Sequence, residues 1–378
     1  MNLDGAIRPK VKNLSSVMTS ALAAIGKGSL TGIASQAETA KREATFDFPA
    51  AKRACVVLAD GLGYHQLSQR FGHAPNIRTF GNQNFITTVV PSTTAAGITS
   101  LGTGLMPGQT AVAGYSLKVP GTRDVFSLIS WNSPRVNPET WQTQSTLFET
   151  VGGELVKVQP AKYVSSGLTQ TGLRGGRTVV AENLTERVDA TVRELRAEAD
   201  LVYLYWDRID ATGHRYGWTS EQWIVELEHF DEEFGRLVRS LPSDTLVVLT
   251  ADHGMIDVSE RIDIRSFDEL TRDVDVVAGE SRAVQVYTSR PEDVANRWQE
   301  FFEDDAWILT KSQAVAEGLF GPVTDFASNV IGDVFAFAKG TLAIVDSKFQ
   351  SPGAIGLIGV HGSLTQEEMH IPLFVDVL

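Results

Sequence analysis

The sequence predicts an α/β protein with a mostly parallel central sheet, helices on both faces of that sheet and a smaller inserted lobe. Three apolar runs, at 53–59, 200–206 and 245–251, have the continuous hydrophobicity of strands buried on both faces. Amphipathic segments at 183–199 and 221–241 alternate with these runs. A repeat of strand, helix and strand folds into a parallel sheet covered by helices, so the pattern predicts the α/β class.

Weaker signals suggest the remaining elements of this core. Strands are expected at 85–90, 126–130 and 155–158, a helix near 64–71, helical turns near 146–151, and a closing strand at the C-terminus.

Residue composition and the pattern of predicted strands and helices divide the chain into three parts. Residues 1–50 are rich in Ala, Ser and Gly and are expected to form an N-terminal arm with a helix from about Ser15 to Ile25. Residues 51–257 and 350–378 are assigned to the α/β core. Between them, strand candidates at 283–287 and 334–338 surround a helix near 291–302, which predicts a smaller α+β lobe over 258–349.

Composition excludes several classes of protein. No apolar run approaches the roughly 20 residues that span a bilayer, and MTSALAAIG near the N-terminus is too short for a cleavable export signal. We therefore expect a cytoplasmic protein without membrane contact. A net charge of −13 disfavours binding to a nucleic-acid duplex, although a local cationic site can still bind an anion. The lone Cys55 lies in an apolar run and is expected to be a buried thiol without a catalytic role. Oligomeric state stays open.

The stretch 90–105, VPSTTAAGITSLGTGL, places Ser92, Thr93 and Thr94 before a small-residue segment that can form a helix. A hydroxyl at a helix N-terminus is either a cap for free backbone N–H groups or a nucleophile, and capping is the commoner role. No charged residue occurs between Arg78 and Lys118. The stretch must therefore be largely buried, or it must face charges that come from other segments.

Four loops after predicted strands carry residues that can bind metals. Each acidic residue alone is unremarkable, because an Asp after a strand is usually a turn former or a helix cap. Parallel strands end at one edge of a sheet, however, and a glycine beside each residue lets the backbone turn tightly. We therefore expect one site to collect the residues Asp60, Asp210, His214, Asp252, His253 and His361.

These loops and the hydroxyl stretch resemble the alkaline phosphatase superfamily, and more narrowly its nucleotide pyrophosphatase/phosphodiesterase branch. The resemblance covers the chain from Cys55 to the C-terminus and rests on five motifs: DGLG at 60–63, PSTT at 91–94, DATGH at 210–214, ADHGM at 251–255 and GVHG at 359–362.

The resemblance implies two metal sites and a nucleophile. One divalent ion would be held by Asp210, His214 and His361. The second would be held by Asp60, Asp252, His253 and the attacking hydroxyl. Family spacing assigns that hydroxyl to Thr94, three residues after the proline, with Thr93 as the alternative.

The donor types agree with this assignment. Mixed Asp and His ligands suit Zn²⁺, although Mn²⁺ or a mixed pair fits the same residues. Two such ions about 4 Å apart stabilise both the attacking and the leaving oxygen in phosphoryl transfer. We expect a dinuclear metal-dependent hydrolase of small phosphate esters or nucleotides, a phosphodiesterase or nucleotide pyrophosphatase that passes through a phosphothreonine.

The sequence departs from the branch at one position. An asparagine that contacts a phosphoryl oxygen usually follows the nucleophile by about twenty residues, whereas this chain reads AVAGYSL there. Tyr115 falls near that position and either donates its hydroxyl to substrate or simply lines the interior.

Other activities remain open. The lack of Lys or Arg around Thr94 favours a diester over a dianionic monoester. A phosphomonoesterase or a phosphonate hydrolase on the same scaffold is an alternative, and a catalytically silent binding protein is an alternative from another class. Asp207 is a substitute ligand that the DxxGH spacing disfavours. Four histidines have no partner at metal-ligand spacing: His65, His73, His229 and His370.

Overall fold

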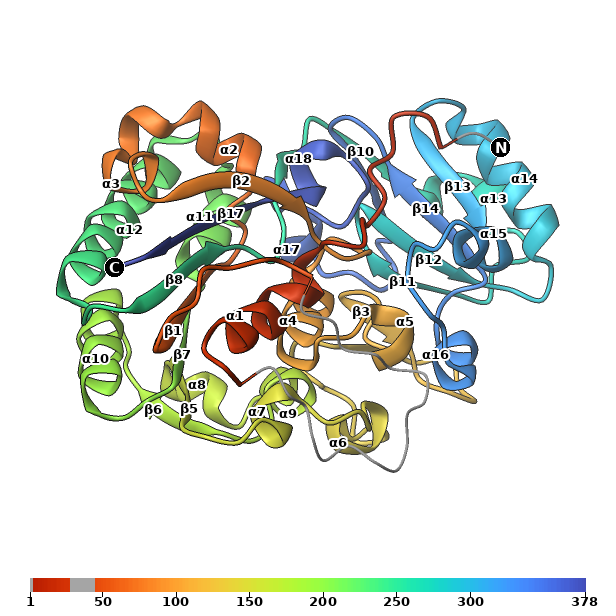
Figure 1. The fold of residues 1–378 in the computed structure, drawn as a ribbon. Coiled ribbons are helices and arrows are strands. Elements are labelled where there is room, and N and C mark those ends of the chain that lie inside the picture. The colour runs from red at the N-terminus through yellow and green to blue at the C-terminus, as the bar shows by residue number, and fades with distance from the viewer. Residues whose placement is uncertain (1–2, 28–44) are drawn as a thin grey trace.

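A computed structural model, which describes residues 3–27 and 45–378, confirms the α/β class (Figure 1). Its main sheet has seven strands in the order β2-β17-β8-β1-β7-β5-β6. Strand β17 (His370–Val377) runs antiparallel to both of its neighbours, β8 and β2 (Asn82–Thr87). The other five strands are parallel: β8 (Thr245–Thr250), β1 (Arg53–Ala59), β7 (Leu201–Trp206), β5 (Leu155–Gln159) and β6 (Arg177–Val180).

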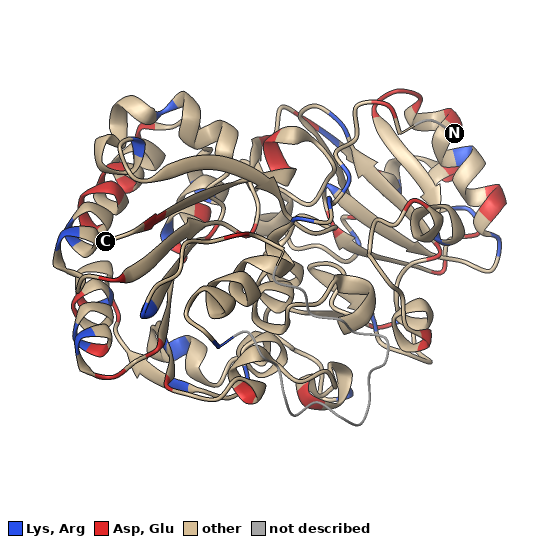
Figure 2. Ribbon diagram, viewed as in Figure 1, with Lys and Arg blue, Asp and Glu red and all other residues tan. Residues whose placement is uncertain are grey.

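Helices cover both faces of this sheet (Figure 1). On one face α10 (Leu184–Ala197) packs on β1, β5 and β7 and contacts α12 (Glu221–Ser240). Both helices bury their apolar stripes, and they also carry many of the charged residues coloured in Figure 2, of which Arg187, Asp231 and Glu233 are buried. On the other face lie α1 (Val17–Ala24) and α4 (Thr94–Thr103), which carry no charged residue. No helix in the described residues is long and apolar enough to cross a membrane.

The expected N-terminal helix is present but contributes to the core. A short 3₁₀ turn, η1 (Leu14–Ser16), leads into α1, whose apolar side chains are buried in the same cluster as β1. The chain before it contacts two distant segments, because the amide of Ile7 donates to the carbonyl of Leu364 (2.8 Å), near the C-terminus, and the indole of Trp307 on β13 donates to the carbonyl of Asp4 (3.2 Å). The part of the expected arm at 28–44 lies outside the described residues.

A second sheet has its own hydrophobic cluster. It is antiparallel, in the order β11 (Val276–Glu280), β12 (Ala283–Tyr287), β14 (Val334–Ala338) and β13 (Ala306–Thr310). Helix α14 (Pro291–Phe302) buries Trp298 and Phe302 beside it. Two short strand pairs connect these sheets in the sequence. Strand β10 (Glu260–Asp263) pairs with β15 (Leu342–Val345), and β9 (Ile256–Asp257) pairs with β16 (Gly359–Val360).

Short elements complete the described chain: α2 (Tyr64–Gln69), η2 (Phe71–His73), α3 (Pro75–Arg78), α5 (Pro107–Thr110), β3 (Ser116–Lys118), β4 (Val125–Ser127), α6 (Pro138–Trp141), α7 (Leu147–Thr150), α8 (Ala161–Val164), α9 (Gly167–Gly172), α11 (Arg208–Tyr216), η3 (Ile264–Ser266), α13 (Asp268–Thr271), α15 (Lys311–Ala316), α16 (Asp325–Val330), α17 (Pro352–Ile355) and α18 (Gln366–Met369).

Two strand predictions need correction. The strand expected at 85–90 is β2, which begins at Asn82, because an exposed edge strand needs no apolar run and its first residues are polar. The strand expected at 126–130 ends at Ser127 and pairs with β3, outside the main sheet.

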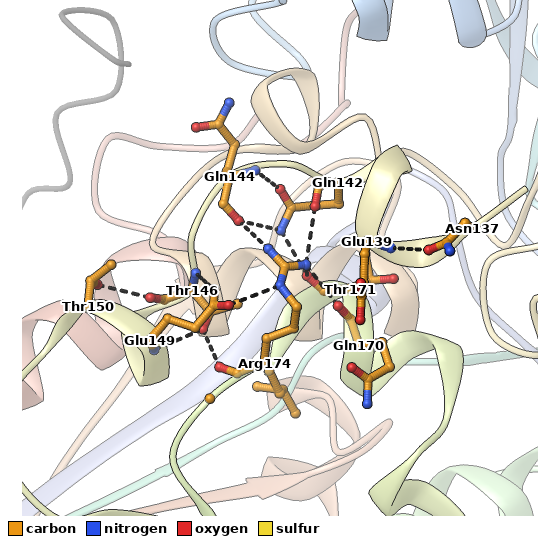
Figure 3. Close-up of polar contacts among 12 residues, drawn as sticks. Asn137, Glu139, Gln142, Gln144, Thr146, Glu149, Thr150, Gln170, Thr171 and Arg174 are labelled. Atoms are coloured by element: carbon orange, nitrogen blue, oxygen red, sulfur yellow. Dashed lines mark hydrogen bonds and ion pairs between the residues drawn. The ribbon is translucent and has the colours of Figure 1, made fainter. Parts of the chain in front are cut away.

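Arg174 anchors the chain before β5 to α9, as Figure 3 shows. Its guanidinium donates to the carbonyls of Gln142 (3.1 Å), Gln144 (2.7 Å) and Gln170 (2.8 Å), and its Nε pairs with Glu149 (3.2 Å). The rigid fork of N–H donors lets one side chain satisfy several carbonyls at once. The network thereby fixes α9, which forms one wall of the cavity described below.

Candidate metal centre and active site

The six Asp and His residues predicted from the sequence gather at one end of the main sheet. Asp60 follows β1, while Asp252 and His253 follow β8. The helix α11 begins directly after β7 and carries Asp210 and His214 one turn apart. Because β8, β1 and β7 are neighbours in the sheet, their carboxyl ends bring these loops together, and the loop after β16 adds His361.

These residues form two groups that share Asp210. In the first group, Asp210 Oδ2 lies 3.2 Å from His214 Nε2, and Asp210 Oδ1 lies 3.8 Å from His361 Nε2. In the second group, Asp60 Oδ1 lies 3.3 Å from His253 Nε2. Within each group the candidate ligand atoms are all within 4.8 Å of one another. Asp252 lies beside the second group, with Oδ2 3.7 Å from His253 Nε2.

All three histidines are oriented by backbone carbonyls. The Nδ1 atoms of His214, His253 and His361 lie 2.7, 2.9 and 2.9 Å from the carbonyl oxygens of Gly359, Gly254 and Ser92. A carbonyl only accepts, so each Nδ1 must carry the proton of that hydrogen bond. In the neutral ring the Nε2 lone pair is then free, and this is how histidines that bind metals are usually held.

The carboxylates are arranged for a cation. Asp60 Oδ1, Asp210 Oδ1 and Asp252 Oδ2 are buried and have no hydrogen-bond partner among the described residues. Burial, together with repulsion from Asp252 and Asp210, holds the pKa of Asp60 well above its usual range. Although burial favours the neutral ring, Asp252 and Asp60 raise the pKa of His253 to about 10. Divalent ions would relieve the repulsion and occupy the free oxygens, so the donor set fits the predicted pair.

Thr94 is the first residue of α4, and its hydroxyl lies 3.1 Å from His253 Nε2. Thr93 occupies the N-cap position, but its buried side chain makes no capping hydrogen bond and instead hydrogen-bonds to the carboxyl of Glu280. Capping therefore does not explain either hydroxyl. Of the two, Thr94 is the residue for which the structure records a contact with the Asp and His cluster.

A cavity of about 430 Å³ opens beside Thr94. Asp60, Asp210 and His361 line it beside Thr94. The remaining wall combines the apolar side chains of Ile98, Ile129, Leu168 and Leu173 with polar residues that include Gln159, Lys162 and Asp207. Tyr115 also lines this cavity and is 47% exposed, so it lies at the rim of the site and not in the interior.

Three residues at the site were not predicted from the sequence. The hydroxyl of Tyr205 donates to Asp60 Oδ2, and Tyr203, on the same side of β7, lines the cavity as well. Tyrosines two residues apart at the end of a buried strand were the available signal. Glu280, at the end of β11, accepts a hydrogen bond from the amide of Tyr115 (3.0 Å). Burial raises the pKa of Glu280 to about 8.

The weaker candidates lie apart from both groups. Asp207 accepts hydrogen bonds from Lys162 Nζ (2.9 Å) and the hydroxyl of Tyr163 (2.8 Å), which accounts for its position. His73 pairs with Glu228 and His229 packs on Trp206. His65 Nε2 lies 2.9 Å from His370 Nδ1.

The chain matches a known protein family over the segment that contains Thr94 and every residue of the two groups. The family model of type I phosphodiesterase/nucleotide pyrophosphatase matches residues 54–363. Venom phosphodiesterase 2 of Crotalus adamanteus is 28% identical over 204 residues, which cover 49% of this chain and 24% of the relative. The chain thus spans about a quarter of that relative's length.

Solved structures share the fold. Murine ectonucleotide pyrophosphatase/phosphodiesterase 5 has a TM-score of 0.66 at 18% identity, covering 85% of this chain and 87% of the other. Phosphonoacetate hydrolase of Sinorhizobium meliloti 1021, in complex with phosphonoformate, also has a TM-score of 0.66 at 18% identity, with 87% and 91% covered.

Proposed function

Because the chain belongs to the type I phosphodiesterase/nucleotide pyrophosphatase family, we propose that it is a dinuclear metal-dependent phosphodiesterase or nucleotide pyrophosphatase with Thr94 as nucleophile. One observation carries the proposal. The Thr94 hydroxyl contacts His253 within a cluster whose imidazole Nε2 atoms and partnerless carboxylate oxygens face one another.

The donor set divides between two ions. Asp210, His214 and His361 would hold one ion. Asp60, Asp252 and His253, together with Thr94, would hold the other. When bound, the ions polarise the phosphoryl oxygens and lower the pKa of the attacking hydroxyl. Nitrogen and oxygen donors of this kind suit Zn²⁺, and Mn²⁺ or a mixed pair fits them as well.

The chain's own residues then account for the group transfer. Thr94 Oγ1 loses its proton and forms a bond to phosphorus, while the bond from phosphorus to the leaving oxygen breaks and that oxygen takes a proton. Water attacks the resulting phosphothreonine, which restores the Thr94 hydroxyl and releases the second product. The free N–H groups at the start of α4 stabilise the anionic phosphate, by roughly 0.3 to 2 kcal/mol depending on burial.

Structural neighbours support a small phosphate-bearing substrate. A structure of the murine phosphodiesterase 5 holds AMP in an inactive variant in which alanine replaces a threonine. The phosphonoacetate hydrolase holds small phosphonates. Both ligand types are within the size of the 430 Å³ cavity, and either would place its phosphorus beside Thr94.

Purified protein should contain stoichiometric divalent metal and hydrolyse bis-p-nitrophenyl phosphate. Thr94→Ala should lower kcat by roughly 10³-fold or more while metal content is retained. Thr93→Ala is the matched control and should keep most of the activity. Full activity in Thr94→Ala, or loss confined to Thr93→Ala, would refute the assignment of the nucleophile.

Substrate comparison separates the alternatives. Rates for bis-p-nitrophenyl phosphate, p-nitrophenyl phosphate and phosphonoacetate distinguish a diesterase from a monoesterase and a phosphonate hydrolase. A preference for the monoester or the phosphonate would overturn the diester assignment. Metal binding without turnover of any of the three would indicate a silent binding protein instead.

A further inference from the structure

A second cavity adjoins the first at Tyr115. It measures about 830 Å³ and lies between the segment 115–135 and the smaller lobe, where β11, β12 and β15 contribute to its wall. Tyr115 lines both cavities, and no other described residue does. The two cavities therefore adjoin at Tyr115, and Thr94 lines the first.

The second cavity suits an organic group better than a free anion. Phe126, Val284 and Ile344 are buried and give it an apolar floor. Its arginines are already compensated, because Arg123 pairs with Asp275 (3.1 Å) and Arg135 pairs with Asp124 (3.3 Å). Apolar surface with a few polar groups is typical of a small-molecule subsite.

Glu280 occupies the junction of the cavities. Glu280 lines the second cavity and accepts from the Tyr115 amide through Oε2 (3.0 Å), while its Oε1 is buried. It also lies against the loop of His361, because a Cβ on Gly362 would come within 2.6 Å of Glu280 Cγ.

The buried side chain of Thr93 is a second hydrogen-bond donor to this carboxyl. Each carboxylate oxygen has two lone pairs, so Glu280 can accept from the Tyr115 amide and from Thr93 and still accept from a donor on a ligand in the second cavity.

We propose that the second cavity binds the second organic substituent of a phosphodiester, one that carries an amino or hydroxyl donor for Glu280 near its ester oxygen. The inference rests on the proposed function. A diester has two substituents that diverge from phosphorus, whereas a monoester has one. Two adjoining cavities, the first of them lined by Thr94, match the diester, and Glu280 selects substrates through a further hydrogen bond that its carboxyl accepts.

Filling the cavity tests the first half of the proposal. Ala354, exposed on α17, lines the second cavity, and Ala316, exposed on α15, lies outside both cavities. In Ala354→Trp, the ratio of kcat/KM for bis-p-nitrophenyl phosphate over methyl p-nitrophenyl phosphate should fall at least tenfold. Ala316→Trp is the matched control and should keep the wild-type ratio. A ratio that changes less than twofold in Ala354→Trp would overturn the assignment of the cavity.

Removing the acceptor tests the second half. The wild type should prefer 2-aminoethyl p-nitrophenyl phosphate over its ethyl analogue, and Glu280→Ala should remove about tenfold of that preference through KM. Glu280→Gln, which keeps a carbonyl acceptor, should retain part of it. An equal loss of kcat on both substrates would show a merely structural role for Glu280. If the wild type turns over no diester, the proposed function itself fails; if it turns over all of them without either selectivity, only this inference fails.

Discussion

Replacing Gly97 with alanine tests how closely α4 must approach the metal ligands. Gly97 lies on the second turn of the helix that begins with Thr94. A Cβ at this position would lie 2.8 Å from Asp252 Cβ and 3.3 Å from Asp252 Cα. Carbon atoms in contact are normally about 3.5 to 4.0 Å apart. The helix or the Asp252 loop must therefore move by roughly 0.7 Å or more to accept one methyl group.

Two energies compete in Gly97→Ala. Alanine is favoured over glycine in a helix by about 1 kcal/mol, while overpacking a buried contact costs about 1 to 3 kcal/mol. The net loss in the free energy of unfolding should lie between about 0 and 2 kcal/mol. Activity should suffer more, because a shift approaching 1 Å between Thr94 and Asp252 lowers kcat/KM by up to about 10²-fold.

Gly353→Ala provides the control. It lies in α17, where the new Cβ would meet only Ser351 Oγ at 3.9 Å, so we expect unchanged kcat/KM and stability equal to or slightly above wild type. Diester turnover and urea unfolding of both variants give the comparison. If Gly97→Ala is as active as Gly353→Ala and more stable than wild type, the close approach of α4 to Asp252 is not required, and the reasoning fails.

Three further predictions follow from the contacts above. Burial and the charge of His65 lower the pKa of His370 to about 4, so between pH 6.5 and 4 the unfolded chain binds a proton that the folded chain does not. The free energy of unfolding should fall as the pH falls through that window, and His370→Gln should reduce the slope in pH-dependent urea titrations. Arg174→Ala should cost about 1 to 3 kcal/mol in urea unfolding because buried carbonyls lose their donor, whereas Arg174→Lys should recover only part of it. Chelation should abolish turnover and lower the unfolding free energy by about 2.7 kcal/mol for an ion that was present at 100 times its Kd; unchanged stability after verified metal loss would contradict the cation-dependent cluster.

Much of the main sheet and the metal cluster could be predicted from sequence for one physical reason. A strand buried on both faces must be apolar along its whole length, so polar residues at its end stand out. Asp60 and Asp252 each follow such a run, and the parallel topology places them at the same edge. The resemblance paired Asp210 with His214 and the sequence placed both on a loop, whereas the structure puts them four residues apart on the helix α11.

Other parts depended on contacts between distant segments, which no local pattern encodes. Glu280 is the last residue of β11, and only the fold brings it to Tyr115, 165 residues away in sequence. The helix α1 is weakly amphipathic, so its burial against β1 depends on an uncovered face of the sheet. Cavities between lobes are likewise invisible to periodicity, since their walls come from several strands at once.

The smaller lobe also determines where a metal ligand lies. Arg282, in the turn just before β12, and Glu368 on α18 form a fully buried pair (2.7 Å), and Glu368 accepts from the amide of Ser363 (3.0 Å), two residues after His361. Removing one partner of a buried ion pair leaves an uncompensated charge, which makes this link costly to break. The lobe that forms a wall of the second cavity therefore also holds the His361 loop, so large changes in that lobe should alter the metal site together with substrate choice. Ala354 is exposed, lines the second cavity and is not a member of the Arg282–Glu368 pair. A substitution that fills the cavity at Ala354 therefore tests substrate specificity more directly than a large change in the lobe does.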